Sequence, residues 1–342
     1  MPSTSLLPVA PATDVPDTMS ALVQHRYGEV AADVLKLERV PVPRPGRGEV
    51  LVRVRAAGVD RGVWHLMAGL PLAVRPAFGL RRPRQPVPGL DLAGTVLAVG
   101  EGVEALAVGD EVLGIGTGTF AQYAVAPAAK LVARPGFVPV EQAAALSISG
   151  LTALQAVRDR ARVVAGERVL VLGASGGVGT YVVQVLRSAG AHVTAVCRGD
   201  RAELVRSLGA DEVIDRTAER WWERSDRWDV ILDGGGNAPL RTLRRALTPH
   251  GRLVVIGGEG GGRLLGGVDR QLRARLWSPF VGQTLGGIVS KEDGRDIGVL
   301  RDMVMAGELT PVVERTWPLA EGAAAVDHLR AGEVRGKVVL TV

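Results

Sequence analysis

Three glycines at fixed spacing give this sequence its clearest chemical signal. Gly173, Gly176 and Gly179 follow an apolar run, Arg168–Leu172, and lead directly into a helical pattern. Glycines at such a junction let backbone N–H groups approach a diphosphate at the positive end of the helix dipole. A second predicted strand, His192–Val196, begins about twenty residues further on, as this kind of site requires. The spacing therefore predicts a dinucleotide-binding site.

The residues after that second strand indicate which dinucleotide binds. A site for NAD usually places Asp or Glu here, where it accepts a hydrogen bond from the ribose 2′-hydroxyl. This chain places Arg198 here, followed by Arg201 and, later, Arg216, and a guanidinium can bind a 2′-phosphate through two hydrogen bonds. Asp200 lies between the first two arginines and would suit NADH if the turn is shifted by a few positions. We predict NADPH as the cofactor, with NADH as the alternative.

Strands and helices alternate through the second half of the chain and must hold this site. The predicted strands are Arg168–Leu172, His192–Val196, Glu212–Ile214, Asp229–Leu232 and Arg252–Ile256. The predicted helices are Val178–Ser188, Ala202–Leu208 and Pro239–Leu247. Such alternation implies a parallel sheet covered by helices on both faces, which is a doubly wound α/β fold.

The first part of the chain, from about Ala21 to Gly136, follows a different pattern of short strands separated by Gly and Pro. Its predicted strands are Glu49–Ala56, Gly94–Val99 and Glu111–Ile115, and a last strand is predicted at Lys337–Val342. The segment Gly69–Gly89 is rich in Pro and Arg and predicts a long loop. This part is predicted to be a β-rich barrel with one long loop.

The composition bounds the class of protein. A chain of 342 residues predicts two domains, and 46% hydrophobic residues suffice for sizeable cores. The net charge is +5, but the arginines are spread along the chain and aromatic residues make up only 4%, so we expect no nucleic-acid partner.

A single cysteine excludes a disulfide within the chain and a multi-cysteine zinc site. No apolar stretch is long enough for a membrane span, and the first eighteen residues carry no basic residue, so we expect no membrane association and a cytoplasmic location.

Several short motifs resemble the medium-chain dehydrogenase/reductase superfamily, in its zinc-independent, quinone-oxidoreductase-like branch. Besides the glycine segment they are Gly89-Leu-Asp-Leu-Ala-Gly94, Val108-Gly-Asp-Glu-Val112, Ala143-Ala-Ala-Leu146, Gly150-Leu-Thr-Ala-Leu-Gln155, Leu208-Gly-Ala-Asp211 and Arg335-Gly-Lys-Val338. The resemblance runs from about Leu22 to Val342. It implies a GroES-like catalytic domain, residues 19–145 and 313–342, into which a Rossmann dinucleotide-binding domain, residues 146–312, is inserted. Residues 1–18 are predicted to be a disordered leader.

The residues predicted to bind the cofactor form the glycine segment, the ends of the following strands and the final strand. They are Gly173, Ala174, Ser175, Gly176, Gly177, Val178, Gly179, Cys197, Arg198, Arg201, Arg216, Asp233, Gly234, Gly235, Ile256, Gly257, Gly258 and Lys337.

The resemblance also suggests how catalysis proceeds. Zinc alcohol dehydrogenases carry a cysteine in the segment that matches Gly58-Val-Asp60 and a histidine in the one that matches Leu90-Asp91, so this chain is predicted to bind no metal. By resemblance, Thr152 faces the nicotinamide and positions it. Asp60 is predicted to donate a proton or bind substrate, with a solvated loop carboxylate as an equal alternative.

Three aromatic residues are candidate walls of the substrate pocket, although such residues are more often plain core. They are Trp64, Phe78 and Phe280.

Hydride transfer to an acceptor that is already electrophilic needs positioning rather than a Lewis acid. The sequence thus favours an NADPH-dependent reductase of a quinone or an α,β-unsaturated carbonyl, acting on a small molecule. Two alternatives are an enoyl-thioester reductase of secondary metabolism and a non-catalytic NADPH-binding sensor. The resemblance also implies a homodimer.

Overall fold

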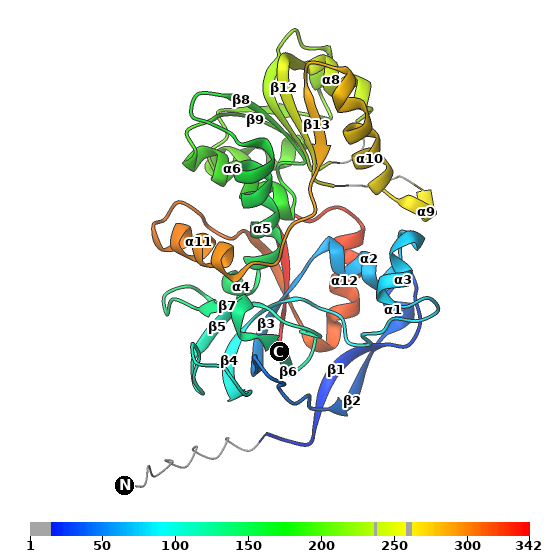
Figure 1. Ribbon diagram of the computed structural model, residues 1–342, viewed down its shortest axis with the longest axis vertical. Coiled ribbons are helices and arrows are strands. Elements are labelled where there is room, and N and C mark those ends of the chain that lie inside the picture. The colour runs from blue at the N-terminus through cyan, green and yellow to red at the C-terminus, as the bar shows by residue number, and fades with distance from the viewer. Residues whose placement is uncertain (1–14, 236–237, 258–261) are drawn as a thin grey trace, which may run out of the picture.

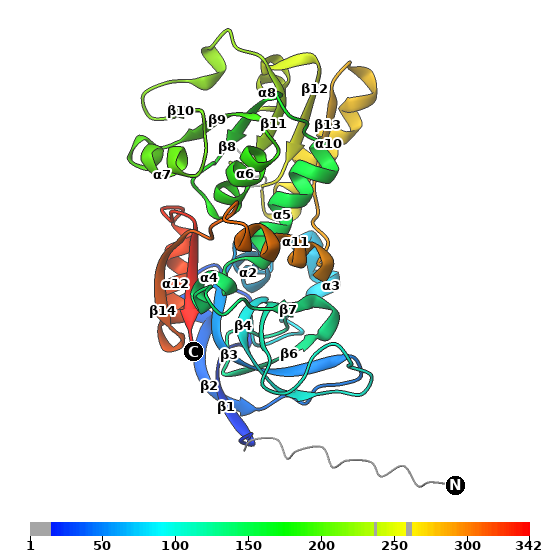
Figure 2. The ribbon, with the colours of Figure 1, turned by 90° about the vertical axis from the view of Figure 1, so that its left-hand side faces the viewer.

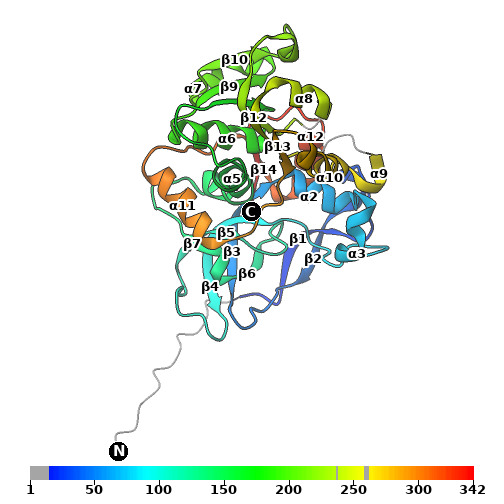
Figure 3. The same cartoon turned by 45° about the horizontal axis from the view of Figure 1, so that its top comes forward.

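The computed structural model describes residues 15–235, 238–257 and 262–342, which form two large β-sheets and a two-stranded one, joined by helices (Figure 1). One sheet is parallel and lies above the other in that view, and α5 (Ser147–Gln155) runs between them. Figure 3 views α5 nearly end-on, at the centre of the molecule.

The parallel sheet has six strands in the order β10-β9-β8-β11-β12-β13 (Figure 2). The strands are β8 (Arg168–Leu172), β9 (His192–Cys197), β10 (Glu212–Asp215), β11 (Trp228–Asp233), β12 (Leu247–Val255) and β13 (Thr284–Gly287). The helices that pack on it are α6 (Gly177–Ser188), α7 (Ala202–Ser207), α8 (Leu240–Ala246) and α10 (Val268–Trp277). Two further helices follow in this part of the chain: α9 (Gly262–Leu265) contacts the turn Leu72–Val74, and α11 (Gly294–Met305) packs against α5 and against residues 131–133 of the second sheet. The chain order reverses direction between β8 and β11, and ligands of open α/β sheets bind at the carboxyl ends of the strands beside such a point.

The second sheet has the strand path β14-β15-β3-β4-β5-β7, and β6 also pairs with β3. Its strands are β3 (Glu49–Val59), β4 (Asp91–Val99), β5 (Glu111–Ile115), β6 (Tyr123–Pro127), β7 (Leu131–Ala133), β14 (Val313–Pro318) and β15 (Lys337–Thr341). A hairpin of β1 (Thr18–Gln24) and β2 (Leu35–Pro41) lies beside it. The accompanying helices are α1 (Ala31–Val34), α2 (Arg61–Ala68), α3 (Arg75–Phe78), α4 (Val140–Ala144) and α12 (Gly322–Arg330).

The predicted fold class is confirmed: a doubly wound parallel sheet lies between two segments that build a GroES-like β-rich unit. Most of the predicted leader falls outside the described residues, although Thr18 already belongs to β1. The predicted long loop contains two short helical turns, one of which is α3. No helix in the described part of the chain combines the length and the apolar character that crossing a membrane requires.

One strand register positions the site. β15 runs antiparallel to β3, with Val338 opposite Val59. Consequently Lys337, the first residue of β15, lies beside Asp60, which follows the last residue of β3. β4 begins at Asp91, three residues earlier than predicted, and a Cβ on Gly58 would come within 2.9 Å of the Asp91 side chain. Charged residues from three distant segments therefore meet at one end of this sheet.

Candidate dinucleotide and active site

The glycine segment forms an open cradle at the start of α6. Gly176 occupies the N-cap position with no side-chain cap, and the first N–H groups of a helix have no partner inside it. A Cβ on Gly176 would meet only the Gly173 carbonyl oxygen, at 3.4 Å, whereas a Cβ on Gly179 would lie 2.1 Å from that same oxygen. Gly179 is therefore required by the packing of α6 on the loop, while Gly176 leaves space that the protein itself does not fill. That space, lined by backbone donors, fits a diphosphate.

The ends of β11 and β12 complete this edge of the sheet. Gly234 donates its N–H to the Leu172 carbonyl. Gly173 has φ +77°, a conformation that favours glycine, and a Cβ on it would lie only 3.0 Å from the Gly235 nitrogen. Ile256 and Gly257 both donate their N–H groups to the carbonyl of Asp233. The structure thus brings these predicted cofactor residues together, whereas Gly258 lies outside the described residues.

Asp233, a predicted cofactor residue, has its carboxylate buried and bound within the protein. Its carboxylate is fully buried and accepts a hydrogen bond from Arg270 of α10 at 2.7 Å. The Arg270 guanidinium also donates to the Ala238 carbonyl. This ion pair fastens α10 to the end of β11, and sequence reasoning missed it because the partners are 37 residues apart.

The arginines predicted to bind the 2′-phosphate of the cofactor lie after β9 and after β10. Arg198 is 3.4 Å from Asp200, and both side chains are about two-fifths exposed. Arg216 follows β10 and is exposed, and its N–H donates to the Cys197 carbonyl. Cys197 itself is buried, which raises the pKa of its thiol.

Arg201 requires a correction. Its side chain is 7% exposed and donates to the carbonyls of Glu333 and Val334 at 2.5 and 3.1 Å. A weaker contact at 3.5 Å reaches the Ser175 hydroxyl of the phosphate loop. The guanidinium is thus engaged by the segment before β15 and joins the two parts of the molecule, rather than facing a ribose phosphate.

The prediction that Lys337 binds the cofactor also needs correction. Its stem passes under the phosphate loop, where a Cβ on Gly177 would lie 3.4 Å from its Cδ. Its side chain, however, is 2% exposed, and its ammonium group donates to Asp60 Oδ1, to Ser149 Oγ at 3.1 Å and to Asp91 Oδ2 at 3.4 Å. We call Asp60, Asp91, Ser149 and Lys337 the buried quartet.

The buried quartet contains two carboxylates and only one ammonium. Ser149 Oγ donates to Asp60 Oδ1 at 2.7 Å, and the Ile148 N–H donates to Asp91 Oδ1 at 2.8 Å. Burial raises the pKa of Asp60, but the Lys337 charge and the hydrogen bonds outweigh this, so the pKa lies below its usual value. Burial and the charge of Asp60 hold the pKa of Asp91 well above its usual value. Two carboxylates and one ammonium are electrically neutral when Asp60 is ionised, Lys337 is charged and Asp91 is protonated.

This charge state bears on the role predicted for Asp60. A carboxylate held ionised by an ammonium is a poor proton donor near neutral pH, so the structure favours the ligand or positioning role over the donor role. The alternative prediction for Asp60, a solvated loop carboxylate, is wrong, because the residue is only 6% exposed.

The buried quartet gives a prediction on pH. Because the pKa of Asp91 is raised in the folded state, its contribution to stability is complete below the unfolded-state pKa and is lost as pH rises toward the folded-state pKa. An Asp91→Asn variant keeps an acceptor for the Ile148 N–H and mimics the protonated acid. We expect the difference in unfolding free energy, wild type minus variant, to fall as pH rises above the unfolded-state pKa of Asp91, with a slope approaching about 1.4 kcal/mol per pH unit until the folded-state pKa is reached. Urea denaturation across that range measures this slope, and a flat difference would contradict the protonated state.

Thr152 on α5 is held by two hydrogen bonds. Its hydroxyl oxygen is 2.9 Å from the Ile148 carbonyl and 3.2 Å from the hydroxyl of Ser290, which follows β13. Sequence reasoning missed Ser290, because no local motif marks it. The predicted contact of Thr152 with a nicotinamide stays a prediction.

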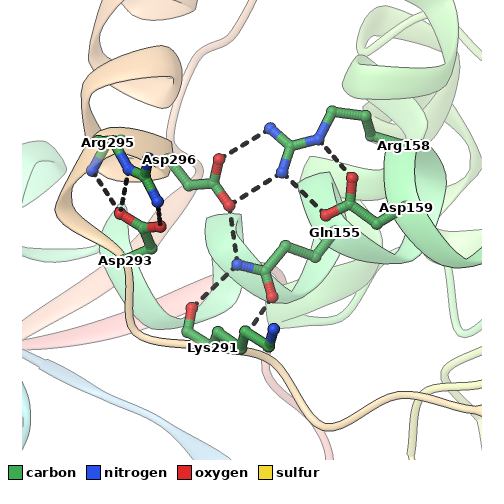
Figure 4. A network of polar contacts seen from close by, with 7 residues as sticks. All are labelled: Gln155, Arg158, Asp159, Lys291, Asp293, Arg295 and Asp296. Atoms are coloured by element: carbon green, nitrogen blue, oxygen red, sulfur yellow. Dashed lines mark hydrogen bonds and ion pairs between the residues drawn. The ribbon is translucent and has the colours of Figure 1, made fainter.

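A polar network fixes the connection that carries Ser290 (Figure 4). Gln155 exchanges two hydrogen bonds with the backbone of Lys291, at 2.8 and 2.9 Å, and donates to Asp296 of α11 at 2.9 Å. Arg158 pairs with both Asp159 and Asp296. The network therefore ties the end of α5 to the segment after β13 and to α11.

The three predicted pocket walls are not brought together. Trp64 on α2 is half-buried and donates its indole N–H to the Glu29 carbonyl at 3.0 Å, and Phe78 on α3 is 48% exposed. Phe280 is 83% exposed and precedes β13, so it lies at the amino end of the parallel sheet, opposite the edge where the cradle opens. The prediction for Phe280 is wrong, because aromatic character alone does not say at which end of a strand a residue lies.

Two family models match the chain. The alcohol dehydrogenase GroES-like domain matches residues 46–136, and the model described as zinc-binding dehydrogenase matches residues 208–340. Among the described residues, no group of three or more His, Cys, Asp or Glu is placed to hold a metal ion. Asp60 and Asp91 lie in the two segments that match ligand-bearing segments of zinc alcohol dehydrogenases, and their carboxylates already contact the Lys337 ammonium. The expectation of no metal stays a prediction.

The chain is similar along most of its length to known oxidoreductases. A chloroplast envelope quinone oxidoreductase homolog from Arabidopsis thaliana is 37% identical over 70% of this chain and 74% of its own length. The mitochondrial NAD(P)H oxidoreductase RTN4IP1 of Mus musculus is 32% identical over 86% of this chain and 82% of its own. The crystal structure of the CurK enoyl reductase superposes with a TM-score of 0.81 at 25% identity, covering 95% and 99% of the two chains.

These similarities agree with the cradle and with the two-sheet fold. Because two of the relatives carry organellar names, the cytoplasmic location stays a prediction, as does the homodimer. The chain is an NAD(P)H-dependent oxidoreductase and belongs to the quinone-oxidoreductase-like branch of the medium-chain dehydrogenase/reductase superfamily.

Proposed function

We propose that this protein is an NADPH-dependent, zinc-independent reductase that transfers hydride to a quinone or to the β-carbon of an α,β-unsaturated carbonyl compound. The observation that carries the preference for NADPH is that the carboxylates of Asp200, just after β9, and Asp215, at the end of β10, are both paired within the protein. Asp200 is flanked by Arg198 and Arg335, and Asp215 accepts hydrogen bonds from the N–H and hydroxyl of Thr217. Both carboxylates are already paired, which disfavours the ribose 2′-hydroxyl of NADH as their partner and leaves guanidiniums for a 2′-phosphate.

The chain's own residues would act mainly by binding and orientation. The N–H groups at the start of α6 would hold the diphosphate, and the glycines that end β8, β11 and β12 admit the dinucleotide backbone without side-chain clashes. Thr152 and Ser290, linked to each other, would orient the reacting end, where the reduced nicotinamide supplies hydride. The hydride brings two electrons and one proton to the acceptor, and a second proton from solvent completes the reduced product.

The preference for NADPH is tested by changing Arg198 to Ala. Because this guanidinium would meet the 2′-phosphate, we expect the Kd for NADPH to rise about tenfold or more, while the Kd for NADH changes less than about twofold. Arg220→Ala is the matched control, since Arg220 is an exposed arginine paired with Glu223. Equal effects of Arg198→Ala on both dinucleotides would contradict the proposed preference.

The acceptor is tested by steady-state oxidation of NADPH with an ortho-quinone, an alkyl enone and an enoyl-CoA. We expect turnover with the first two. Activity with the thioester alone would replace the proposal by an enoyl-thioester reductase, a reading supported by the similarity to the CurK structure. Tight binding of NADPH without turnover of any acceptor would indicate a sensor.

A further inference from the structure

Arg335 reaches the predicted 2′-phosphate site from outside the parallel-sheet unit. It lies two residues before β15, and its Nη2 donates to Asp200 Oδ2 at 3.2 Å. The other carboxylate oxygen of Asp200 is 3.4 Å from Arg198 Nε. Asp200 thus holds one guanidinium from each of the two units of the molecule, and all three side chains are between 40 and 50% exposed.

The backbone that carries Arg335 is fixed against the phosphate loop. The Gly336 N–H donates to the Ser175 carbonyl at 2.9 Å. On the other side, the buried Arg201 guanidinium binds the carbonyls of Glu333 and Val334. Arg335 is therefore a surface side chain on a rigid base, beside the carboxyl end of β9 where the adenosine ribose of a Rossmann cofactor lies.

The charges around Asp200 favour an anionic ligand. One carboxylate between two guanidiniums leaves a net positive charge, and a monoester phosphate carries nearly two negative charges at neutral pH. Guanidinium groups bind phosphate through paired, charge-assisted hydrogen bonds. A 2′-phosphate would thus offer both arginines a stronger partner than Asp200. The uncharged 2′-hydroxyl of NADH would be a weaker partner than Asp200.

We propose that Arg335 and Arg198 form a two-arginine clasp that binds the 2′-phosphate of NADPH, with Asp200 holding both guanidiniums in place when no phosphate is bound. This inference rests on the proposed use of NADPH and adds a specificity-determining residue from the C-terminal segment. The clasp also accounts for the acidic residue at a position where an acid would otherwise indicate NADH: the carboxylate of Asp200 is directed to the arginines.

The test measures dinucleotide affinity by fluorescence titration of the full-length protein. For Arg335→Ala we expect the Kd for NADPH to rise about tenfold and the Kd for NADH to change less than about twofold. The same split is expected between 2′,5′-ADP and ADP, which lack the nicotinamide and so report the adenosine end alone. Arg330→Ala is the matched control, because Arg330 is a nearby, similarly exposed arginine that pairs with Asp327.

The outcomes separate this inference from the proposed function. If Arg198→Ala weakens NADPH selectively and Arg335→Ala does not, the clasp is overturned while NADPH specificity stands. If the wild-type protein does not prefer NADPH and neither variant discriminates, both fall. An Asp200→Asn variant that loses affinity for NADH alone would show that Asp200 binds the ribose hydroxyl, which also overturns the clasp.

Discussion

Replacing Lys337 by Met is expected to lower the free energy of unfolding by about 3–5 kcal/mol, because it leaves a buried carboxylate without its cation. Methionine has nearly the volume of the lysine stem, so little packing is lost. Asp60 and Asp91 are 6% and 0% exposed, and neither can turn to water without opening the contact between β3 and β15. Urea denaturation at neutral pH measures the loss. Lys36→Met is the control, since Lys36 is an exposed lysine whose ammonium binds only a carbonyl one turn away.

A double variant separates the ion pair from packing. Asn at position 60 keeps an acceptor for the Ser149 hydroxyl but carries no charge, so adding Asp60→Asn to Lys337→Met removes the unpaired charge. We expect the double variant to recover part of the stability that the single variant loses. If the two losses simply add, the ammonium and the carboxylate do not interact and the assignment of the buried quartet is wrong.

Local signals predicted the parallel sheet and the cradle, because strand, glycine turn and helix follow one another within about twenty residues. The strands β8 and β5 match their predicted bounds. The helix predicted to extend to Leu247 ends at Ala246, because β12 already begins at Leu247.

The long-range contacts could not be predicted in the same way. The buried quartet joins residues 60, 91, 149 and 337, and only the register of β15 on β3 reveals that they meet. Arg201 was predicted to bind the 2′-phosphate because it follows the second strand of the dinucleotide site, and Lys337 lies in one of the motifs that carry the resemblance. Carbonyls and carboxylates from distant segments bind these two side chains instead. One sequence signal could suggest such an ion pair. It is a charged residue at the first position of one strand together with an opposite charge just after the last position of another.

The same substitution is expected to affect dinucleotide affinity at Gly176 and folding stability at Gly179. Gly176→Ala places a methyl group where only one protein atom lies within 4 Å, at 3.4 Å, and its φ of −83° is open to any residue. We expect the unfolding free energy to stay within about 1 kcal/mol of wild type. The Kd for NADPH and for NADH should both rise about tenfold or more, because the methyl group occupies the space predicted for the diphosphate. Titration and urea denaturation of one preparation measure both quantities.

Gly179→Ala is the matched comparison, since it adds the same methyl group three residues further along the chain. There the new atom would lie 2.1 Å from the Gly173 carbonyl oxygen and 2.8 Å from Ala174, so α6 must move away from the loop. We expect a loss of about 1–3 kcal/mol in stability, although alanine favours a helix interior by about 1 kcal/mol where nothing clashes. A stabilised Gly179→Ala protein would show that α6 does not pack as described. Unchanged dinucleotide affinity in a folded Gly176→Ala protein would show that the diphosphate binds elsewhere, because nothing in the protein's own packing requires that glycine.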